Sequence, residues 1–285
     1  MEKGFLLSII TDEVSQDPEE ALELVREFGF HGVELRSVWN SPVEELPWEK
    51  LLELSQRLKK LGLKVSAIAS SLFKDDWKRL DEEKLDRLTE ACHVLECDRI
   101  RGFSFWKSPD YSDEAFAELL VQLDSRLSQE GITLVLENDP SVNLATGFDL
   151  ARFFQNHRFQ NIGVLWDPGN DIYTTGVSTY PQAYEALRDS VRHVHVKDAV
   201  CKEGEPIGVA PGNGWMDFEG QFQDLLRDGY RGWVVLEPHF RLEGTIDEEL
   251  LKRPGGAAFS EGGYLPSRIA MASLLDILQK VYGGM

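Results

Sequence analysis

The sequence predicts a single (β/α)8 barrel that spans residues 1–285. Short apolar runs alternate with amphipathic helical patterns, and this pairing repeats eight times along the chain. Such alternation is typical of parallel strands joined by right-handed crossovers. No Gly-x-Gly-x-x-Gly follows the first apolar run, which argues against an open dinucleotide-binding sheet. The predicted strands end near Ile10, Leu35, Ser70, Ser104, Glu137, Asp167, His195 and Glu237.

Helix start and stop signals separate the first four strands. Asp17-Pro18 places an N-cap residue before a proline at the first helical position, and Gly29 ends that helix. Ser112 caps a later helix, which Gly131 ends. We therefore expect strands at 5–10, 32–35, 64–70 and 99–104, with helices at 18–28, 48–61, 81–95 and 113–130.

The second half of the chain repeats this pattern with shorter helices. Asp217 caps one of them, and the segment 242–264 looks like an insertion before the last helix. This insertion carries two Gly-Gly pairs and is expected to be either a lid or a subunit contact of a homo-oligomer. We expect strands at 132–137, 163–167, 191–196 and 232–237, with helices at 148–154, 182–188, 218–226 and 267–282.

Composition narrows the class of partner. The chain has 30 Lys and Arg against 49 Asp and Glu, so its net charge of −19 repels nucleic-acid phosphates and anionic membrane surfaces. No apolar run reaches the ~18 residues of a membrane span. The first residues, Met1 to Gly4, lack the pattern of a signal peptide. The cysteines (Cys92, Cys97 and Cys201) are too few and scattered for a disulfide framework, so a cytoplasmic location is expected.

Four consecutive predicted strands end in residues that can bind a metal ion. Glu137, Asp167 and Glu237 each terminate an apolar run, and His195 lies at the end of the strand between the last two. Active sites of such barrels lie at these strand ends, where the side chains converge. Three unpaired carboxylates would repel one another unless they are protonated or bridged by a cation. One imidazole with three carboxylates suits Mn2+, Mg2+, Co2+ or Zn2+.

The stretch Arg192 to Asp198 places His193, His195 and Lys197 on one face of a strand. His195 is the expected ligand, and His193, one step deeper, is expected to orient a ligand carboxylate. Lys197 has two interpretations of equal weight. It neutralises a developing oxyanion or holds a substrate oxygen, or it pairs with Asp198 or a ligand carboxylate.

Several motifs resemble the xylose isomerase-like barrel superfamily in its sugar phosphate isomerase/epimerase branch, a fold shared with endonuclease IV. The resemblance implies a divalent ion, Mn2+ first, held by Glu137, Asp167, His195 and Glu237, with the two glutamates also transferring protons. Two positions depart from the ketose 3-epimerase pattern: Asn170 replaces a histidine, and Cys201 replaces an arginine. The matching pieces are Leu136-Glu137-Asn138, Trp166 to Asn170, His193 to Asp198, Pro211 to Gly214 and Leu236-Glu237, with Ser8 to Glu13 and Gly32 to Leu35 also similar.

Further residues are candidates for contact with the substrate, each with a structural alternative. Glu34 and Arg101 either face the substrate or form buried ion pairs. Trp106 either covers the C–H face of a sugar or packs in the core, and Arg241 is a candidate anchor for a phosphate or carboxylate. The full set of substrate-binding candidates is Glu34, Arg101, Trp106, Asn170, His193 and Arg241.

The favoured function is that of an isomerase or epimerase of a sugar, polyol or sugar phosphate, which moves a proton through a metal-stabilised enediolate with Glu137, Glu237 and Lys197 as catalytic groups. A lyase that dehydrates an inosose or dehydroshikimate-like substrate is the second hypothesis. A DNA-repair endonuclease would need more histidines than the 6 present and a basic groove. A barrel that binds a metal and a ligand without turnover is the fourth.

Overall fold

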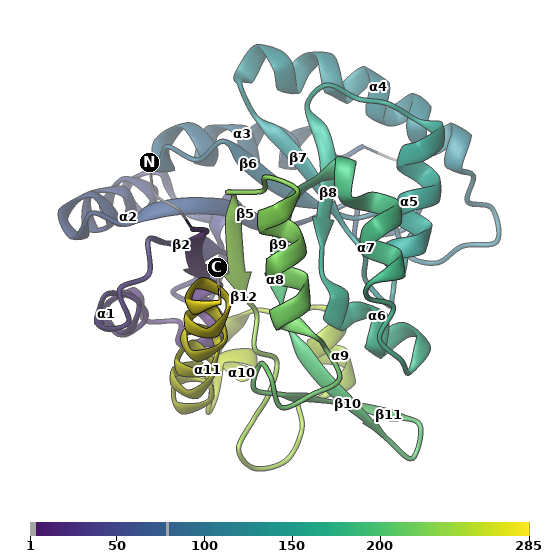
Figure 1. Cartoon of the computed structure of the whole chain (residues 1–285). Coiled ribbons are helices and arrows are strands. Elements are labelled where there is room, and N and C mark those ends of the chain that lie inside the picture. The colour runs from purple at the N-terminus through teal and green to yellow at the C-terminus, as the bar shows by residue number, and fades with distance from the viewer. Residues whose placement is uncertain (1–3, 78–79, 285) are drawn as a thin grey trace.

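The computed structural model describes residues 4–77 and 80–284, and its centre is a barrel of eight parallel strands (Figure 1). The prediction about a signal peptide rests partly on residues 1–3, which lie outside the described residues. The order around the barrel is β1-β12-β9-β8-β7-β6-β5-β2. The two edge strands of this sheet, β1 and β2, contact each other and are joined by a parallel bridge between Ile10 and Glu34, which closes the barrel. The strands are β1 (Leu6–Ile9), β2 (Gly32–Leu35), β5 (Lys64–Leu72), β6 (Arg99–Gly102), β7 (Thr133–Glu137), β8 (Ile162–Trp166), β9 (Val191–Val196) and β12 (Trp233–Leu236).

Helices cover the outside of the barrel, so the predicted (β/α)8 fold is confirmed. The expected caps form: Asp17 accepts a hydrogen bond from the backbone N–H of Glu19, and Ser112 accepts one from Ala115. The main core lies between the strands and this helical layer. None of the described helices is both long enough and apolar enough to span a membrane. The helices that alternate with the strands are α1 (Pro18–Glu27), α2 (Trp48–Leu61), α3 (Glu82–Leu95), α4 (Asp113–Glu130), α5 (Gly147–Asn156), α7 (Gln182–Leu187), α8 (Phe218–Arg227) and α11 (Tyr264–Gly283).

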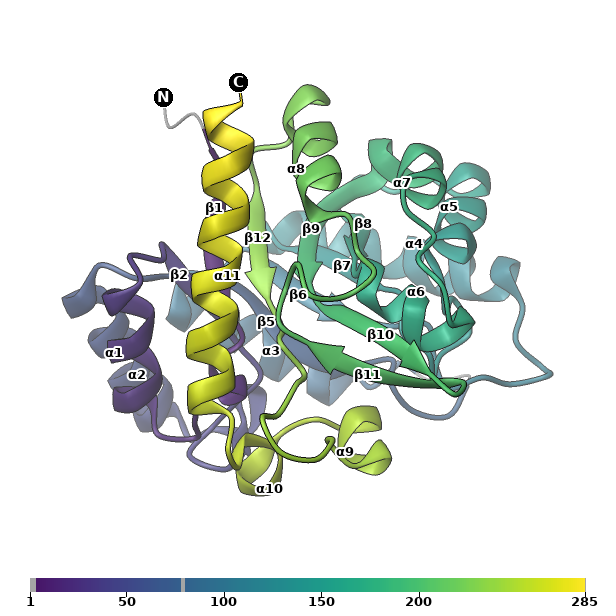
Figure 2. The same cartoon turned by 60° about the horizontal axis from the view of Figure 1, so that its bottom comes forward.

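Additional elements gather at the end of the barrel to which the strands point (Figure 2). The helix α6 (Pro168–Thr175) begins directly after β8, and the antiparallel hairpin of β10 (Asp198–Lys202) and β11 (Glu205–Val209) follows β9. The inserted segment holds α9 (Glu248–Lys252) and α10 (Gly256–Ser260). Smaller pieces near the same end are β3 (Ser37–Val38), β4 (Ser41–Pro42) and the 3-10 turns 11–13 and 43–45.

The alternation of β9 divides its side chains between two environments. Val194 and Val196 belong to the apolar core that faces the helices. His193 and His195 are fully buried and reach Glu34 across the barrel interior. The barrel interior is therefore polar where these two histidines meet Glu34, and every buried polar group there needs a partner.

Candidate metal centre

Four side chains meet at the carboxyl ends of neighbouring strands. Glu137 ends β7, Asp167 follows β8, His195 lies in β9 and Glu237 follows β12. Because these strands are consecutive around the barrel, one ligand atom from each residue lies within 4.8 Å of the other three. All four side chains are buried. The residues that the sequence predicted as one metal-binding group are thus brought together.

The unsatisfied atoms of this group fit a cation. Asp167 Oδ2, His195 Nδ1 and Glu237 Oε2 are buried and make no hydrogen bond of good geometry with any described residue, although Lys197 Nζ lies 2.9 and 2.8 Å from the two oxygens. Buried polar atoms whose hydrogen bonds are incomplete are rare and costly. A divalent ion would satisfy these acceptors at once, and an imidazole with carboxylates is a ligand set that such ions accept.

The chain around Asp167 fixes the direction of its carboxylate. Its Oδ1 accepts a hydrogen bond from the backbone N–H of Asn170 at 3.1 Å and so caps α6, which leaves Oδ2 facing the cluster. The Asn138 side chain joins the ends of β7 and β8, because it accepts from the Asp167 N–H at 3.0 Å and donates to the Asp167 carbonyl at 2.7 Å. Gly169 allows α6 to approach β9, since a Cβ there would lie 2.3 Å from the Lys197 carbonyl oxygen.

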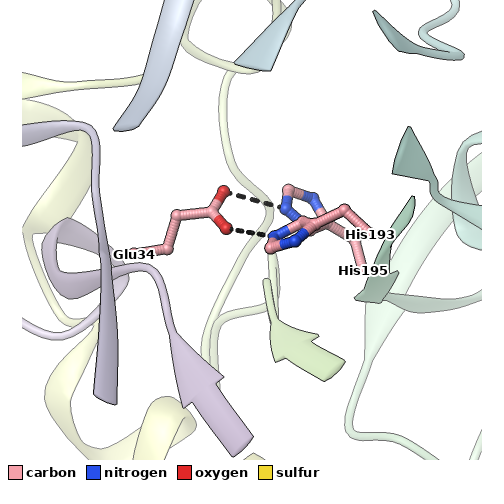
Figure 3. Close-up of side chains that lie close together, drawn as sticks. All are labelled: Glu34, His193 and His195. Carbon is pink, nitrogen blue, oxygen red and sulfur yellow. Dashed lines mark hydrogen bonds and ion pairs between the residues drawn. The ribbon is translucent and has the colours of Figure 1, made fainter. Parts of the chain in front are cut away.

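Glu34 holds both histidines of β9 from the opposite side of the barrel (Figure 3). Its two oxygens lie 2.7 Å from His193 Nε2 and 2.9 Å from His195 Nε2. His195 Nδ1 lies 3.3 Å from both Glu137 and Glu237. Burial would lower the pKa of His195, but Glu34, Glu137 and Glu237 raise it well above the usual value, so Nδ1 would have to release a proton before it could bind an ion. Burial alone would raise the pKa of Glu34, but the two imidazoles outweigh it and lower that pKa. His193 therefore orients His195 through Glu34 and does not contact a ligand carboxylate directly.

Lys197 supplies the positive charge closest to the cluster. Its Nζ lies 2.9 Å from Asp167 Oδ2 and 2.8 Å from Glu237 Oε2, and it donates a hydrogen bond to Asn170 Oδ1 at 3.1 Å. Burial would lower the pKa of Lys197, but Asp167 and Glu237 raise it well above the usual value. The ammonium group is therefore charged and shares two carboxylate oxygens with the ligand set.

Two arginines balance the glutamates. Arg101 lies 3.1 Å from Glu137 and 3.8 Å from Glu237, so this residue forms the buried ion pair that was its structural alternative. Arg36 lies 3.0 Å from Glu237 and was missed in the sequence. The signal was available, because Arg36 is two residues beyond Glu34 and hence on the same face of the chain.

A second acidic group adjoins the first. Glu13, Glu237 and His239 also have ligand atoms within 4.8 Å of one another. The Arg36 guanidinium, however, lies 2.9 Å from Glu13 and 3.0 Å from Glu237. Burial and the Lys197 ammonium would lower the pKa of His239, but Glu13 and Glu237 raise it above its usual value. The charges of this group are balanced within the protein, and we assign no ion to it.

A cavity of about 510 Å³ opens above the cluster, within the usual size range of small-molecule sites. Arg101, Glu137, Lys197 and Glu237 line it, together with His239. The other substrate-binding candidates do not line it. Glu34, His193 and Asn170 are buried behind the ligands, Trp106 lies near the rim over Lys74 and Arg253, and Arg241 donates to the main-chain carbonyls of Phe240, Phe259 and Glu261.

Asp198 has a structural role that explains the glycine-rich motif after the hairpin. Its carboxylate accepts hydrogen bonds from the backbone N–H groups of Ala199, Gly212, Gly214 and Met216. A Cβ at Gly214 would lie 2.1 Å from Asp198 Oδ1, so only glycine fits there. Asp198 is therefore not the partner of Lys197.

Known proteins resemble this chain in sequence and in fold. The xylose isomerase-like TIM barrel family matches residues 22–253. An inosose dehydratase of Bacillus licheniformis is 30% identical over 151 residues, which are 47% of this chain and 50% of that protein. The chain thus spans about half the length of this relative. A 3-dehydro-D-guloside 4-epimerase of Escherichia coli is 24% identical over 257 residues, 79% of this chain and 90% of that protein. A crystal structure of the IOLI protein with a bound zinc atom has a TM-score of 0.70 at 16% identity, covering 97% of this chain and 99% of that one, which shows the shared fold.

Proposed function

Because the chain belongs to the xylose isomerase-like TIM barrel family, we propose that it is a divalent-metal-dependent epimerase or isomerase of a keto sugar or keto cyclitol. The reaction would remove a proton from the carbon next to the carbonyl group and return it. The observation that carries the proposal is the convergence of three buried polar atoms that lack a hydrogen bond of good geometry, Asp167 Oδ2, His195 Nδ1 and Glu237 Oε2, beneath a cavity of substrate size. Dehydratases and epimerases among the relatives support a proton transfer of this kind.

Glu137, Asp167, His195 and Glu237 would hold the ion. When bound, a divalent ion acts as a Lewis acid that polarises the carbonyl and makes the neighbouring carbon-bound proton more acidic. Mn2+, Mg2+, Co2+ and Zn2+ all suit the ligand set. The zinc atom in the structural relative supports including Zn2+ among the ions to be tried.

Glu137 and Glu237 are the proposed proton-transfer groups. They line the same cavity from β7 and from the end of β12, which are three positions apart in the barrel order. A substrate between them would meet one carboxylate on each side, so one glutamate can remove the proton and the other can return it on the opposite face. This arrangement favours epimerisation.

Lys197 and Arg101 are the proposed groups that stabilise negative charge on the substrate. Both are cationic and line the cavity next to the two glutamates. Donors that are fixed before the reaction stabilise a developing oxyanion more than water does, because they need no reorientation.

Dehydration is the second candidate, and His239 is the observation that favours it. Its Nε2 lies 3.4 Å from Glu237 and 3.0 Å from Glu13, and it lines the cavity. From this position, a protonated His239 imidazole could supply the proton that a leaving hydroxyl group needs. The two reactions share the first proton transfer and differ in the fate of that hydroxyl.

The proposal is tested with chelator-treated protein that is reloaded with one ion at a time. Each form is incubated in D2O with inososes, D-allulose and 3-keto glycosides. Deuterium at the carbon next to the carbonyl, with an inverted centre in the product, would support epimerisation. A new ultraviolet absorbance from an enone would support dehydration. Failure of every ion to bind or to activate exchange would refute the proposal.

Single variants separate the two glutamates. Glu137→Gln and Glu237→Gln should each abolish epimerisation. The variant that keeps the glutamate facing the proton of a given epimer should still exchange that proton with D2O, because it lacks only the glutamate that delivers a proton to the opposite face. Metal content is measured for each variant, since both residues are also proposed ligands. Glu205→Gln, on the exposed hairpin, is the matched control and should react like the parent protein.

A further inference from the structure

The segment between β12 and α11 lies at the end of the barrel to which the strands point (Figure 2). Residues 251–256, from the end of α9 to the start of α10, line the cavity opposite the metal-binding cluster. The segment therefore forms part of the wall of the same cavity that Glu137 and Glu237 line.

The α10 half of the segment is fixed to the barrel. Phe259 is fully buried, with the Arg36 guanidinium 4.5 Å from its ring centre and the His239 ring edge-on at 5.5 Å. Arg241, which points away from the cavity, braces this half by donating to the carbonyl oxygens of Phe259 and Glu261. This half therefore cannot move without losing buried contacts.

The α9 half is held much more weakly. None of the residues of α9 is buried. Lys252 forms its ion pairs with Glu248 and Glu249 of the same helix, at 3.0 and 3.1 Å. The contact with the opposite wall is made by Arg253, whose guanidinium lies 5.6 Å from the ring centre of Trp106. A cation–π contact of this kind is a modest interaction at a partly exposed site.

Two consecutive glycines with positive φ lie between the two halves. Gly255 has φ 139° and Gly256 has φ 73°, values that residues with a Cβ rarely adopt. The backbone N–H of Gly256 donates to Ser37 Oγ at 3.1 Å, which fixes the position of the joint on the barrel. Two residues without a Cβ thus connect a half with buried contacts to a half that has none.

We infer that residues 247–254 form a lid that swings about Gly255–Gly256, and that Arg253 resting on Trp106 is the latch of its closed state. The use of the lid rests on the proposed function, because closure would exclude water from the proton transfer. Arg253 and Lys252 would then contact the part of the substrate that is distant from the metal. The existence of the lid does not depend on the reaction.

The latch is tested by cleavage of the folded, chelator-treated protein with endoproteinase Lys-C. Cleavage after Lys252 reports the population of the open lid, because opening is fast relative to cleavage at low protease concentration. Trp106→Leu removes the aromatic face and leaves the cleavage sequence unchanged. It should accelerate cleavage after Lys252 about two- to fivefold, while Trp106→Phe, which keeps an aromatic face, should remain close to the parent rate.

Two controls make the result specific. Lys202, at the exposed tip of the β10–β11 hairpin, is an internal reference whose cleavage should not change. Trp215→Leu replaces an exposed tryptophan that does not line the cavity, and it should leave cleavage after Lys252 unchanged. Equal rates after Lys252 in Trp106→Leu and the parent protein, or equal acceleration at Lys202, would overturn the latch. No substrate is present, so this outcome is independent of whether the proposed reaction is correct.

Discussion

Replacing Lys197 by methionine removes the charge that balances the metal-binding cluster while it retains a long side chain. The Lys197 ammonium lies 2.9 Å from Asp167 and 2.8 Å from Glu237, and all three side chains are at most 4% exposed. Removing one partner of a buried ion pair costs about 3–5 kcal/mol, because the remaining charge stays desolvated. We therefore expect Lys197→Met to lower the free energy of unfolding by this amount when a chelator is present.

A divalent ion should restore much of the lost stability. The ammonium group and the proposed ion would compete for the same two carboxylate oxygens, so the ion should bind more tightly when the ammonium is absent. An ion at 100 times its Kd stabilises a protein by about 2.7 kcal/mol, and each further tenfold gain in affinity adds about 1.4 kcal/mol. Urea unfolding, followed by circular dichroism with chelator or with excess Zn2+ or Mn2+, should show a larger metal-dependent gain for the variant than for the parent protein.

Lys74→Met is the matched control. Lys74 lines the same cavity and is 5% exposed, and its Nζ lies 2.8 Å from Asp139, which is not part of the cluster. This variant should lose a similar amount of stability without the additional gain from metal. The reasoning would be refuted if Lys197→Met were as stable as the parent protein in chelator, or if metal stabilised both variants equally.

Three further predictions concern the groups behind the site. Glu34→Ala should weaken metal binding roughly 10- to 100-fold, measured by competition with a chelating dye; unchanged affinity would show that Glu34 does not orient the imidazole. Asp171 accepts hydrogen bonds from Asn138, Gly147 and Thr179, and burial raises its pKa from 3.8 to about 7. The free energy of unfolding should therefore fall as the pH rises from about 4 to about 7, by up to about 4 kcal/mol, and Asp171→Asn should lack this slope in urea titrations; parallel curves would contradict it. Gly169→Ala would place a Cβ 2.3 Å from the Lys197 carbonyl oxygen and should cost about 1–3 kcal/mol and weaken metal binding, whereas Gly283→Ala, where no atom lies within 4 Å, should do neither.

The barrel and the four clustered residues could be predicted because local patterns determine them. Apolar runs fix the strands, and parallel strands point the same way, so residues at their ends must meet at one end of the barrel. Helix boundaries followed from caps such as Asp17 and Ser112. The helix α6 was not predicted, although Asp167-Pro168 carries the same N-cap and proline signal as Asp17-Pro18. Asp167 uses one oxygen for this cap and directs the other at the cluster, so the two expectations for this residue are compatible.

Partners across the barrel could not be predicted in the same way. Strand spacing places Glu34 and His193 at particular depths, but it does not show that they face each other over the barrel interior. The role of Arg36 depends on the same long-range geometry. Arg241 was a candidate anion anchor, yet it donates to main-chain carbonyls. This role could not be predicted, because the sequence of the insertion that Arg241 supports has no periodic pattern from which its fold could be read.

The divided duty of the Asp167 carboxylate bears on which ions the protein can discriminate. One oxygen is committed to the first turn of α6, so the side chain cannot rotate or open into a two-oxygen grip on a larger ion. Calcium tolerates irregular shells of six to eight oxygens, whereas smaller ions require a more exact arrangement. The hydrogen bond to α6 fixes the direction of the Asp167 carboxylate. An ion that required a different direction could bind Asp167 only if that hydrogen bond at the start of the helix were broken or distorted. The hydrogen bond at the start of α6 would thus favour small divalent ions over larger ones such as calcium.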